Sequence, residues 1–202
     1  MDIFQLLFPF FIILFSIIIH EFAHGYVAYL LGDETAYRHG RLTLNPVPHI
    51  DVIGSIIVPA ISYMTASTFL GWAKPVPINL NNINHKYGEV MVAAAGVVSN
   101  ISLAFICGVA YKFLYLNGLM TEGLSKALFT VIGVNVSLAF FNLIPIPPFD
   151  GMAILQGFFP KLRFFTGIIY NPIFMILAII VASNIYMLFS PYIFRIVINL
   201  IS

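Results

Sequence analysis

Charge is scarce in this sequence. Only 8% of its 202 residues are Asp, Glu, Lys or Arg, whereas soluble domains carry roughly 25%. Hydrophobic residues make up 60% of the chain. So few polar side chains cannot cover a water-soluble globule of this length, and lipid must therefore be the solvent for most of the surface. The formal net charge of +1 leaves neither a basic field for nucleic acid nor an acidic tail.

Cysteine is also nearly absent, and no cleavable signal peptide is indicated. Cys107 is the only cysteine, so no intrachain disulfide can form. Asp2 is the only charged residue before Glu21, and the apolar run Ile3–Ile19 exceeds the roughly 7–15 residues of a signal peptide. This run predicts a retained membrane helix. Because no repeat is present and every polar gap is short, residues 1–202 are predicted to form one intramembrane domain.

Long apolar runs stand in place of the missing charge. A helix needs about 20 apolar residues to cross the hydrocarbon core. The segments that meet this requirement are residues 3–31, 88–117, 124–145 and 166–190. A fifth, Val52–Leu70, is ambiguous because Gly54 and Pro59 interrupt it. We therefore predict an α-helical polytopic membrane protein, a bundle of about four to five transmembrane helices.

Two of the polar gaps have patterns of their own. Thr35–Pro46 alternates in residue type and contains Thr and Leu, which predicts a short strand or β-hairpin. Gly71–Asn79 reads GWAKPVPIN. It cannot form a regular helix, because Pro75 and Pro77 each remove a backbone donor and restrict the preceding residue.

The first predicted helix carries His20-Glu21-Phe22-Ala23-His24. Residues four apart lie on one helical face, so both imidazoles can bind one metal ion. Glu21 adjoins the first ligand, where it can take a proton from a zinc-bound water and deliver it to the leaving amine. Two histidines at the membrane interface could produce the same sequence pattern. A glutamate this far along an apolar run is costly, however, and indicates function. The motif therefore predicts a zinc site.

A catalytic zinc site needs three protein ligands and one open position. Three further histidines fall in polar or proline-bounded stretches typical of the membrane interface, namely His39, His49 and His85. Asp150 is a stronger candidate, because closely spaced prolines break the helix before it and Gly151 permits a turn after it. Asp150 could equally cap the segment that follows, and spacing alone leaves both roles open.

Three motifs occur in order along the chain. They are H-E-x-x-H at His20–His24, G-x-x-x-N at Gly96–Asn100, and N-x-x-P-x-P-x-x-D-G at Asn142–Gly151. Together they resemble the site-2 protease family of intramembrane zinc metalloproteases, in its compact bacterial branch. Residues 40–46 and 71–79 also look like that branch, and the resemblance covers roughly residues 15–155. Val97 departs from it, because the family commonly has proline at that position.

The resemblance implies Asp150 as third ligand of one Zn²⁺ per chain. It implies that the Thr35–Pro46 hairpin is embedded in the membrane and pairs with an unwound substrate segment. It further implies that Asn142 and Asn100 bind the substrate backbone or the oxyanion near zinc, with hydrogen bonding between helices as the alternative. Asn135 is assigned a structural role.

One metal ion constrains the topology. It can contact both His20 and Asp150 only if their helices run in the same direction, so the chain between them crosses the bilayer an odd number of times. The segment 88–117 supplies one crossing. A second full crossing by residues 52–70 would put Asp150 on the wrong side. We therefore predict that this segment is re-entrant and turns near Gly54–Pro59.

Lysine and arginine placement favours an N-terminus outside the cell. The basic residues that would then lie inside are Arg38, Arg41, Lys74, Lys86, Lys161 and Arg163. Only Lys112, Lys126 and Arg195 would lie outside. The resemblance implies a bacterial cytoplasmic membrane, with zinc nearer the cytoplasmic face. Tyr192–Ser202 either lies along the interface or completes a helix.

These features predict a zinc-dependent endopeptidase that hydrolyses peptide bonds in or near transmembrane segments of membrane proteins. Its partners would be a transmembrane protein substrate and the lipid bilayer. The alternative is a metal-binding membrane protein without peptidase activity, such as a transporter or scaffold. Such a protein would be expected to lack Glu21 or to carry acidic residues along several helices. A haem protein fits less well, because His20 and His24 share one helical face.

Overall fold

The computed structural model describes residues 3–66, 71–163 and 172–201, and four long helices dominate these ranges. The long helices are α1 (Ile3–Leu30), α4 (Gly88–Leu116), α5 (Glu122–Leu143) and α7 (Pro172–Ile201). Each is long and apolar enough to cross a membrane. The predicted helical membrane fold is confirmed at this level.

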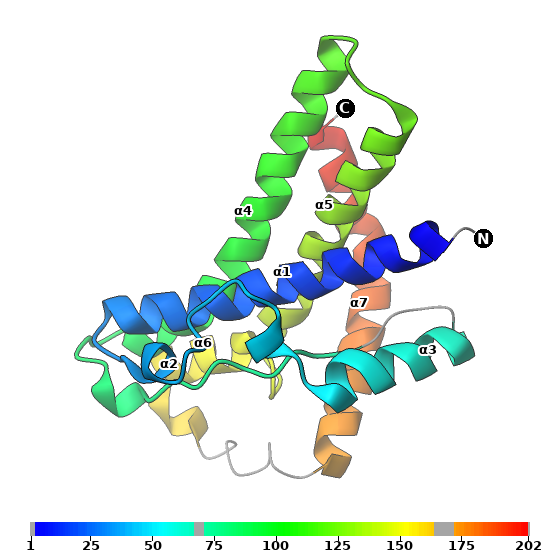
Figure 1. Ribbon diagram of the computed structural model, residues 1–202. Coiled ribbons are helices and arrows are strands. Elements are labelled where there is room, and N and C mark those ends of the chain that lie inside the picture. Colours follow the sequence, from blue (N-terminus) through cyan, green and yellow to red (C-terminus); the bar gives the residue numbers. More distant parts are fainter. Residues whose placement is uncertain (1–2, 67–70, 164–171, 202) are drawn as a thin grey trace.

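Shorter elements connect the long helices. They are α2 (Thr35–Arg38), η1 (Val47–His49), the π-helical η2 (Val52–Ile57), α3 (Val58–Ala66), η3 (Leu80–Asn82) and α6 (Asp150–Phe158). Helix α4 is central, since it packs against α1, α5, α6 and α7. Helices α4 and α5 form a hairpin, α1 crosses it, and α6 lies beside α4 near the end of α1 that leads to α2 (Figure 1).

The end of α5 is built to turn the chain back toward α1. Helix α5 stops at Leu143, where Pro145, Pro147 and Pro148 follow. A Cβ at Gly151 would lie 2.3 Å from the carbonyl oxygen of Leu143. Only glycine permits this approach. It lets α6 start close against the last turn of α5.

The predicted β-hairpin over residues 35–46 is wrong. All of these residues are described, and none is in a strand. Thr35 starts the short helix α2, and Gly40 turns with a positive φ of 63°. A strand needs a partner that completes its hydrogen-bond ladder. The neighbouring segment 71–79 is instead bound by a side chain, because Arg41 donates to the carbonyl of Lys74.

The predicted re-entrant turn near Gly54–Pro59 is not supported. Residues 52–66 continue as helix through η2 into α3, because the wider π turn keeps the chain helical across Gly54. Residues 67–70 lie outside the described part of the chain. The last predicted span also ended too early, since α7 continues through Pro191 to Ile201.

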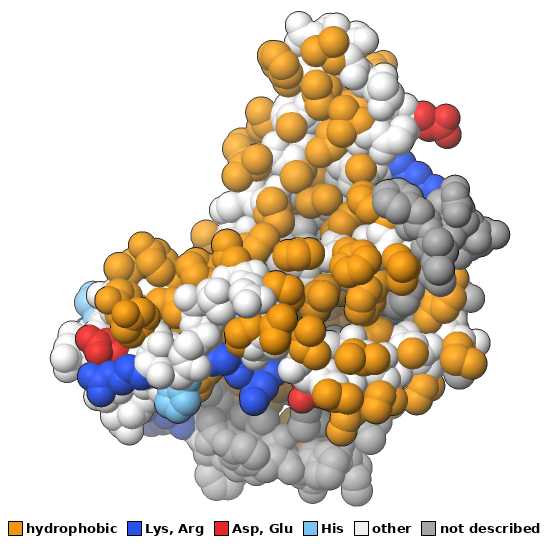
Figure 2. Space-filling view, viewed as in Figure 1, with side chains coloured by type: hydrophobic (Ala, Val, Ile, Leu, Met, Phe, Trp, Pro, Cys, Tyr) orange, Lys and Arg blue, Asp and Glu red, His pale blue; other side chains and the backbone are white. Residues whose placement is uncertain are grey.

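Polar and apolar side chains are separated along the molecule. Charged side chains gather near α2 and near the loop between α4 and α5, with hydrophobic side chains over the surface between them (Figure 2). Many large apolar residues are exposed, such as Phe105 at 69% and Leu116 at 72%. Exposure on this scale suits a surface that contacts lipid rather than water.

Candidate metal centre

Helices α1 and α6 bring three potential metal ligands together. Nε2 of His24 lies 3.0 Å from Nε2 of His20. The Nε2 atoms of His20 and His24 lie 3.1 and 3.3 Å from Oδ2 of Asp150. This is the single group of His, Cys, Asp and Glu within the described ranges that could hold a metal ion. The structure thus assembles the residues that the sequence proposed as ligands, although they are far apart in the chain.

Asp150 does not cap the following helix, which was the alternative role considered from the sequence. It is the first residue of α6, whose N-cap position is Phe149 and has no side-chain cap. Its Oδ2 atom is buried and receives no well-aligned hydrogen bond, despite the two imidazoles nearby. An orphaned buried carboxylate oxygen is costly. Its position opposite two ring nitrogens indicates that a cation belongs there.

The backbone fixes the tautomer of His24. Its Nδ1 lies 2.7 Å from the carbonyl oxygen of Val92 on α4. A carbonyl can only accept, so Nδ1 must carry the proton and donate it. In the neutral imidazole that binds a metal, the lone pair of His24 is therefore on Nε2, which faces Asp150.

A chain of amides fixes the tautomer of His20. The Asn135 amide nitrogen donates to the carbonyl of Val131 at 2.9 Å, which identifies its other end as the acceptor. Asn100 donates to that oxygen at 2.8 Å, so its own oxygen faces Nδ1 of His20 at 2.6 Å. His20 therefore donates from Nδ1 and presents the lone pair of Nε2. The network ends at Ser16, whose hydroxyl accepts from Asn135 at 2.9 Å.

These assignments leave three electron-rich atoms facing one another. Without a cation between them, two imidazole lone pairs and a carboxylate oxygen would repel at about 3 Å. Three ligands of a tetrahedral zinc ion lie roughly 3.3 Å apart for metal–ligand distances of about 2.0–2.1 Å. The separations of 3.0, 3.1 and 3.3 Å are close to this value. The donor set therefore fits zinc, with the fourth position open.

Helix α4 closes one side of the cluster at Gly96. A Cβ there would lie 2.4 Å from Nε2 of His24 and 2.6 Å from Nε2 of His20. The motif that the sequence analysis matched at Gly96–Asn100 thus has two functions in the structure. Gly96 leaves space for both imidazoles, and Asn100 orients one of them.

The Glu21 side chain, next to the ligand His20 in the sequence, contacts the described segment 71–79. Its Oε2 atom accepts a hydrogen bond of 2.8 Å from the backbone N–H of Val76. Among the described residues, none donates a hydrogen bond to the other oxygen, Oε1. The carboxylate is thus held by one oxygen, and the second has no donor among the described residues.

The roles of the three asparagines differ from those expected from the sequence. Asn100 is fully buried, and both ends of its amide make the hydrogen bonds between helices that were the alternative role. Its substrate contact stays a prediction. Asn135, assigned only a structural role, belongs to the network that orients His20. A buried amide in an apolar helix was the available signal, but nothing in the sequence indicated its partner. Asn142 donates to the carbonyl of Leu138 at 3.0 Å, and its substrate contact stays a prediction.

The remaining histidines lie outside the cluster. His39 and His85 are exposed, as expected. His49 is fully buried, which corrects its expected position at the interface, and its Nε2 lies 2.8 Å from the carbonyl of Thr43.

Asn100→Ala is expected to lower zinc affinity about 10- to 100-fold, the usual effect of losing a group that orients a ligand. His20 would lose the partner that fixes its tautomer, while all three ligands remain. Zinc affinity measured by chelator competition tests this. Asn184→Ala is the matched control, since Asn184 is an exposed amide on α7 whose hydrogen bond among the described residues is to Ile180 of its own helix. Equal affinity of the two variants would remove Asn100 from the site.

Comparison with known proteins places the chain in a family. The family model described as "Peptidase family M50" matches residues 109–183, a range that includes Asp150. The chain is 38% identical over 151 residues to "Putative zinc metalloprotease YwhC" of Bacillus subtilis, covering 72% of this chain and 66% of that protein. It is 26% identical over 164 residues to "Putative zinc metalloprotease Rip2" of Mycobacterium tuberculosis, covering 74% of this chain and 55% of that protein. No solved structure matches.

Four apolar helices of spanning length and a His-His-Asp cluster with two buried histidines are typical of an integral membrane metalloprotein. The chain belongs to peptidase family M50, the family of the site-2 proteases. It spans 66% and 55% of the two relatives named above.

Proposed function

We propose that this chain is a zinc-dependent intramembrane endopeptidase of the site-2 protease type. The observation that carries the proposal is the convergence of two imidazole lone pairs and an orphaned carboxylate oxygen beside Glu21. The names of the relatives support the same activity. Three of the elements around the cluster, α1, α4 and α5, are apolar enough to span a membrane, which supports cleavage within the bilayer.

His20, His24 and Asp150 would hold one Zn²⁺ per chain. When bound there, zinc supplies Lewis acidity and a water of lowered pKa as the nucleophile. The proton transfers then fall to the protein. Glu21 takes the proton from the attacking water and returns it to the leaving amine. The hydrogen bond to Oε2 fixes the carboxylate, and Oε1 accepts and donates the proton.

The substrates we propose are transmembrane segments of other proteins, which reach the site from the surrounding bilayer. Water must reach the same site for hydrolysis. The nearby charged end at α2 offers a polar approach (Figure 2). Asn142, at the last turn of α5, is proposed to bind the substrate backbone.

Metal content and cleavage together test this function. The purified chain is expected to bind one zinc ion and to cleave a model transmembrane substrate in vesicles. Combining His20→Ala with His24→Ala should remove both zinc and cleavage, because one carboxylate alone holds zinc poorly. His39→Ala combined with His85→Ala is the matched control, since both side chains are exposed. A zinc content unchanged by the first pair would refute the site. Zinc without cleavage by the natural protein would favour a metal-binding protein that is not a peptidase.

We further propose that α2 and η3 face the same side of the membrane. Asp33, just before α2, accepts hydrogen bonds from Asn79 and Asn82, which flank and form η3. The described helical segment 52–66 then does not cross the bilayer. The surplus of lysine and arginine at this end supports a cytoplasmic position in a bacterial cytoplasmic membrane.

Cysteine labelling tests this topology. In a Cys107→Ser background, Arg38→Cys and Asn82→Cys should react with an impermeant thiol reagent from the same side of sealed vesicles. Lys112→Cys, near the far end of α4, should react only from the opposite side. Labelling of positions 38 and 82 from opposite sides would contradict the proposed topology.

A further inference from the structure

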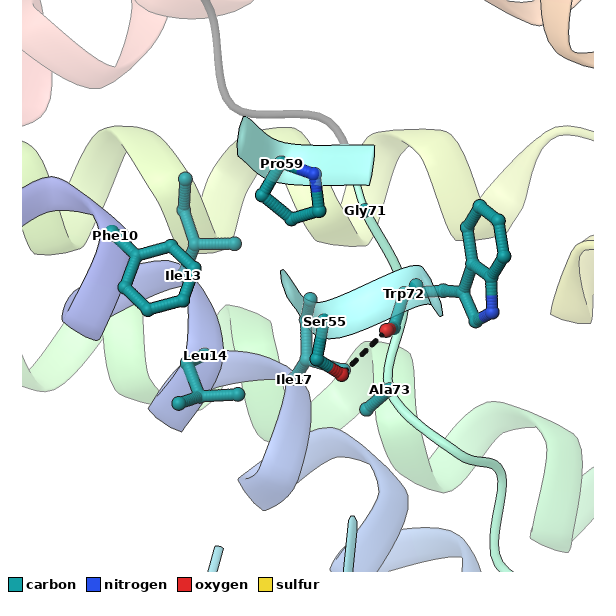
Figure 3. Close-up of a pocket in the computed structure, with 10 residues that line it drawn as sticks. Phe10, Ile13, Leu14, Ile17, Ser55, Pro59, Gly71, Trp72 and Ala73 are labelled. Atoms are coloured by element: carbon teal, nitrogen blue, oxygen red, sulfur yellow. Dashed lines mark hydrogen bonds between the residues drawn. The ribbon is translucent and has the colours of Figure 1, made fainter. Parts of the chain in front are cut away.

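Residues 71–79, here called the strap, run in extended form past the face of α1 that carries Glu21. The strap begins beside η2. The Trp72 N–H donates to the carbonyl of Gly54 at 3.0 Å. The Ser55 hydroxyl donates to the carbonyl of Trp72 at 2.9 Å (Figure 3). The first strap residues also line a small apolar pocket with α1 (Figure 3). The start of the strap is thus fixed by hydrogen bonds to η2 and by packing against α1.

The middle of the strap is held by a buried cation. Arg41 is only 8% exposed, and its guanidinium donates to the carbonyls of Lys74 and Pro75 at 2.7 and 3.2 Å. The Lys74 N–H donates to the carbonyl of His49 at 2.9 Å. Hydrogen bonds from a charged donor are stronger than neutral ones. They fix the strap immediately before Val76.

The end of the strap is held by a buried anion. Asp33 is fully buried and accepts from the Asn79 N–H at 2.7 Å and from the Asn82 amide at 2.8 Å. Burial by itself would raise the pKa of Asp33, but hydrogen bonds from Thr35, Asn79 and Asn82 outweigh it and hold the pKa below its usual range. The carboxylate is therefore ionised at neutral pH and anchors the strap.

Between these anchors the strap offers one backbone donor to Glu21. Pro75 and Pro77 have no N–H, so Val76 carries the single N–H of this tripeptide. The proline that follows keeps Val76 extended. Val76 is only 6% exposed, and its side chain fits against Gly25, one helical turn beyond Glu21. The N–H of Val76 then reaches Oε2 of Glu21 at 2.8 Å.

We propose that the backbone N–H of Val76 is a positioning group for the Glu21 carboxylate, kept in place by Arg41 and Asp33. This inference rests on the proposed peptidase function. A general base must be held in a narrow geometry, and a small misplacement is costly. A backbone donor on an anchored segment provides this without a flexible side chain. The two prolines ensure that no neighbouring N–H competes for the carboxylate.

Val76→Pro removes the donor and suits the extended chain between two prolines. It is expected to lower kcat about 10- to 100-fold, the effect of losing a hydrogen bond to a charged group. KM for a model transmembrane substrate should stay the same, because the substitution removes one backbone N–H and leaves the extended path of the strap unchanged. Zinc content should also be unchanged, since no ligand is touched. Replacing the amide of residue 76 by an ester removes the same N–H while keeping the valine side chain, and it should give the same loss.

Two comparisons isolate the N–H from the side chain and from proline itself. Val76→Ala keeps the donor but loses the packing against Gly25, so its kcat should clearly exceed that of Val76→Pro. Ile78→Pro places a proline in the same strap, at an N–H for which the described residues supply no acceptor, and should retain kcat. Equal kcat for the ester variant and the natural protein would overturn the proposal. Absence of cleavage by the natural protein would instead overturn the proposed function.

Amide hydrogen exchange supplies a measurement that does not depend on activity. Exchange of the Val76 amide should become about tenfold faster or more in Glu21→Ala, because the acceptor is lost. The Lys74 amide, which bonds to His49, should keep its rate. An unchanged rate at Val76 would show that the hydrogen bond to Glu21 does not form in the membrane, and would also overturn the proposal.

Discussion

Glu21→Gln is expected to bind zinc as the natural chain does and to lose about 10²- to 10⁴-fold in peptide hydrolysis. The amide is nearly isosteric with the carboxylate and can still accept from the Val76 N–H, so the site should stay assembled. It cannot take a proton from water or return one to the leaving amine. Zinc content and kcat for a model transmembrane substrate, measured on the same preparation, test both halves of this expectation.

Glu34→Gln is the matched control for that variant. Glu34 is exposed and pairs with Arg38 on the surface of α2, and such pairs contribute little to stability. Its activity should equal that of the natural protein. Hydrolysis by Glu21→Gln at a similar rate would exclude Glu21 as the general base and leave only the metal to account for any cleavage.

Gly96→Ala is expected to reduce zinc affinity by about 10- to 100-fold or more, with a matching loss of activity. A methyl group at this position would lie 2.4–2.6 Å from ring atoms of both histidines. The imidazoles are held from behind by Val92 and Asn100. They cannot move back without breaking those hydrogen bonds, so the ligands would be displaced from one another.

Gly123→Ala is the control for the substitution itself. A Cβ at Gly123 would meet nothing within 4 Å, and the residue lies in the first turn of α5. It should bind zinc normally and be at least as stable, since alanine favours helix over glycine. If Gly96→Ala bound zinc as tightly as Gly123→Ala, the imidazoles would not occupy the positions described here when metal is bound.

The sequence alone was sufficient for properties that depend on local composition or on helical spacing. Apolar runs of spanning length predicted α1, α4 and α5 well. The ligand pair His20 and His24 followed from a spacing of four on one helical face. Asp150 required more than spacing, because the residues alone left a ligand and a helix cap equally open. The resemblance to a family favoured the ligand, and the structure brings its carboxylate to the two imidazoles.

Other features depend on which parts of the chain meet in space, and these the sequence did not determine. The hairpin expected over residues 35–46 does not form, because a strand needs a partner that completes its hydrogen bonds. The adjacent segment 71–79 is bound by the Arg41 side chain instead. The link from Asn135 through Asn100 to His20 joins three helices, so no local pattern reveals it. The same holds for the strap. Two prolines showed that residues 71–79 are not helical, but only packing against α1 decided that the N–H of Val76 faces Glu21.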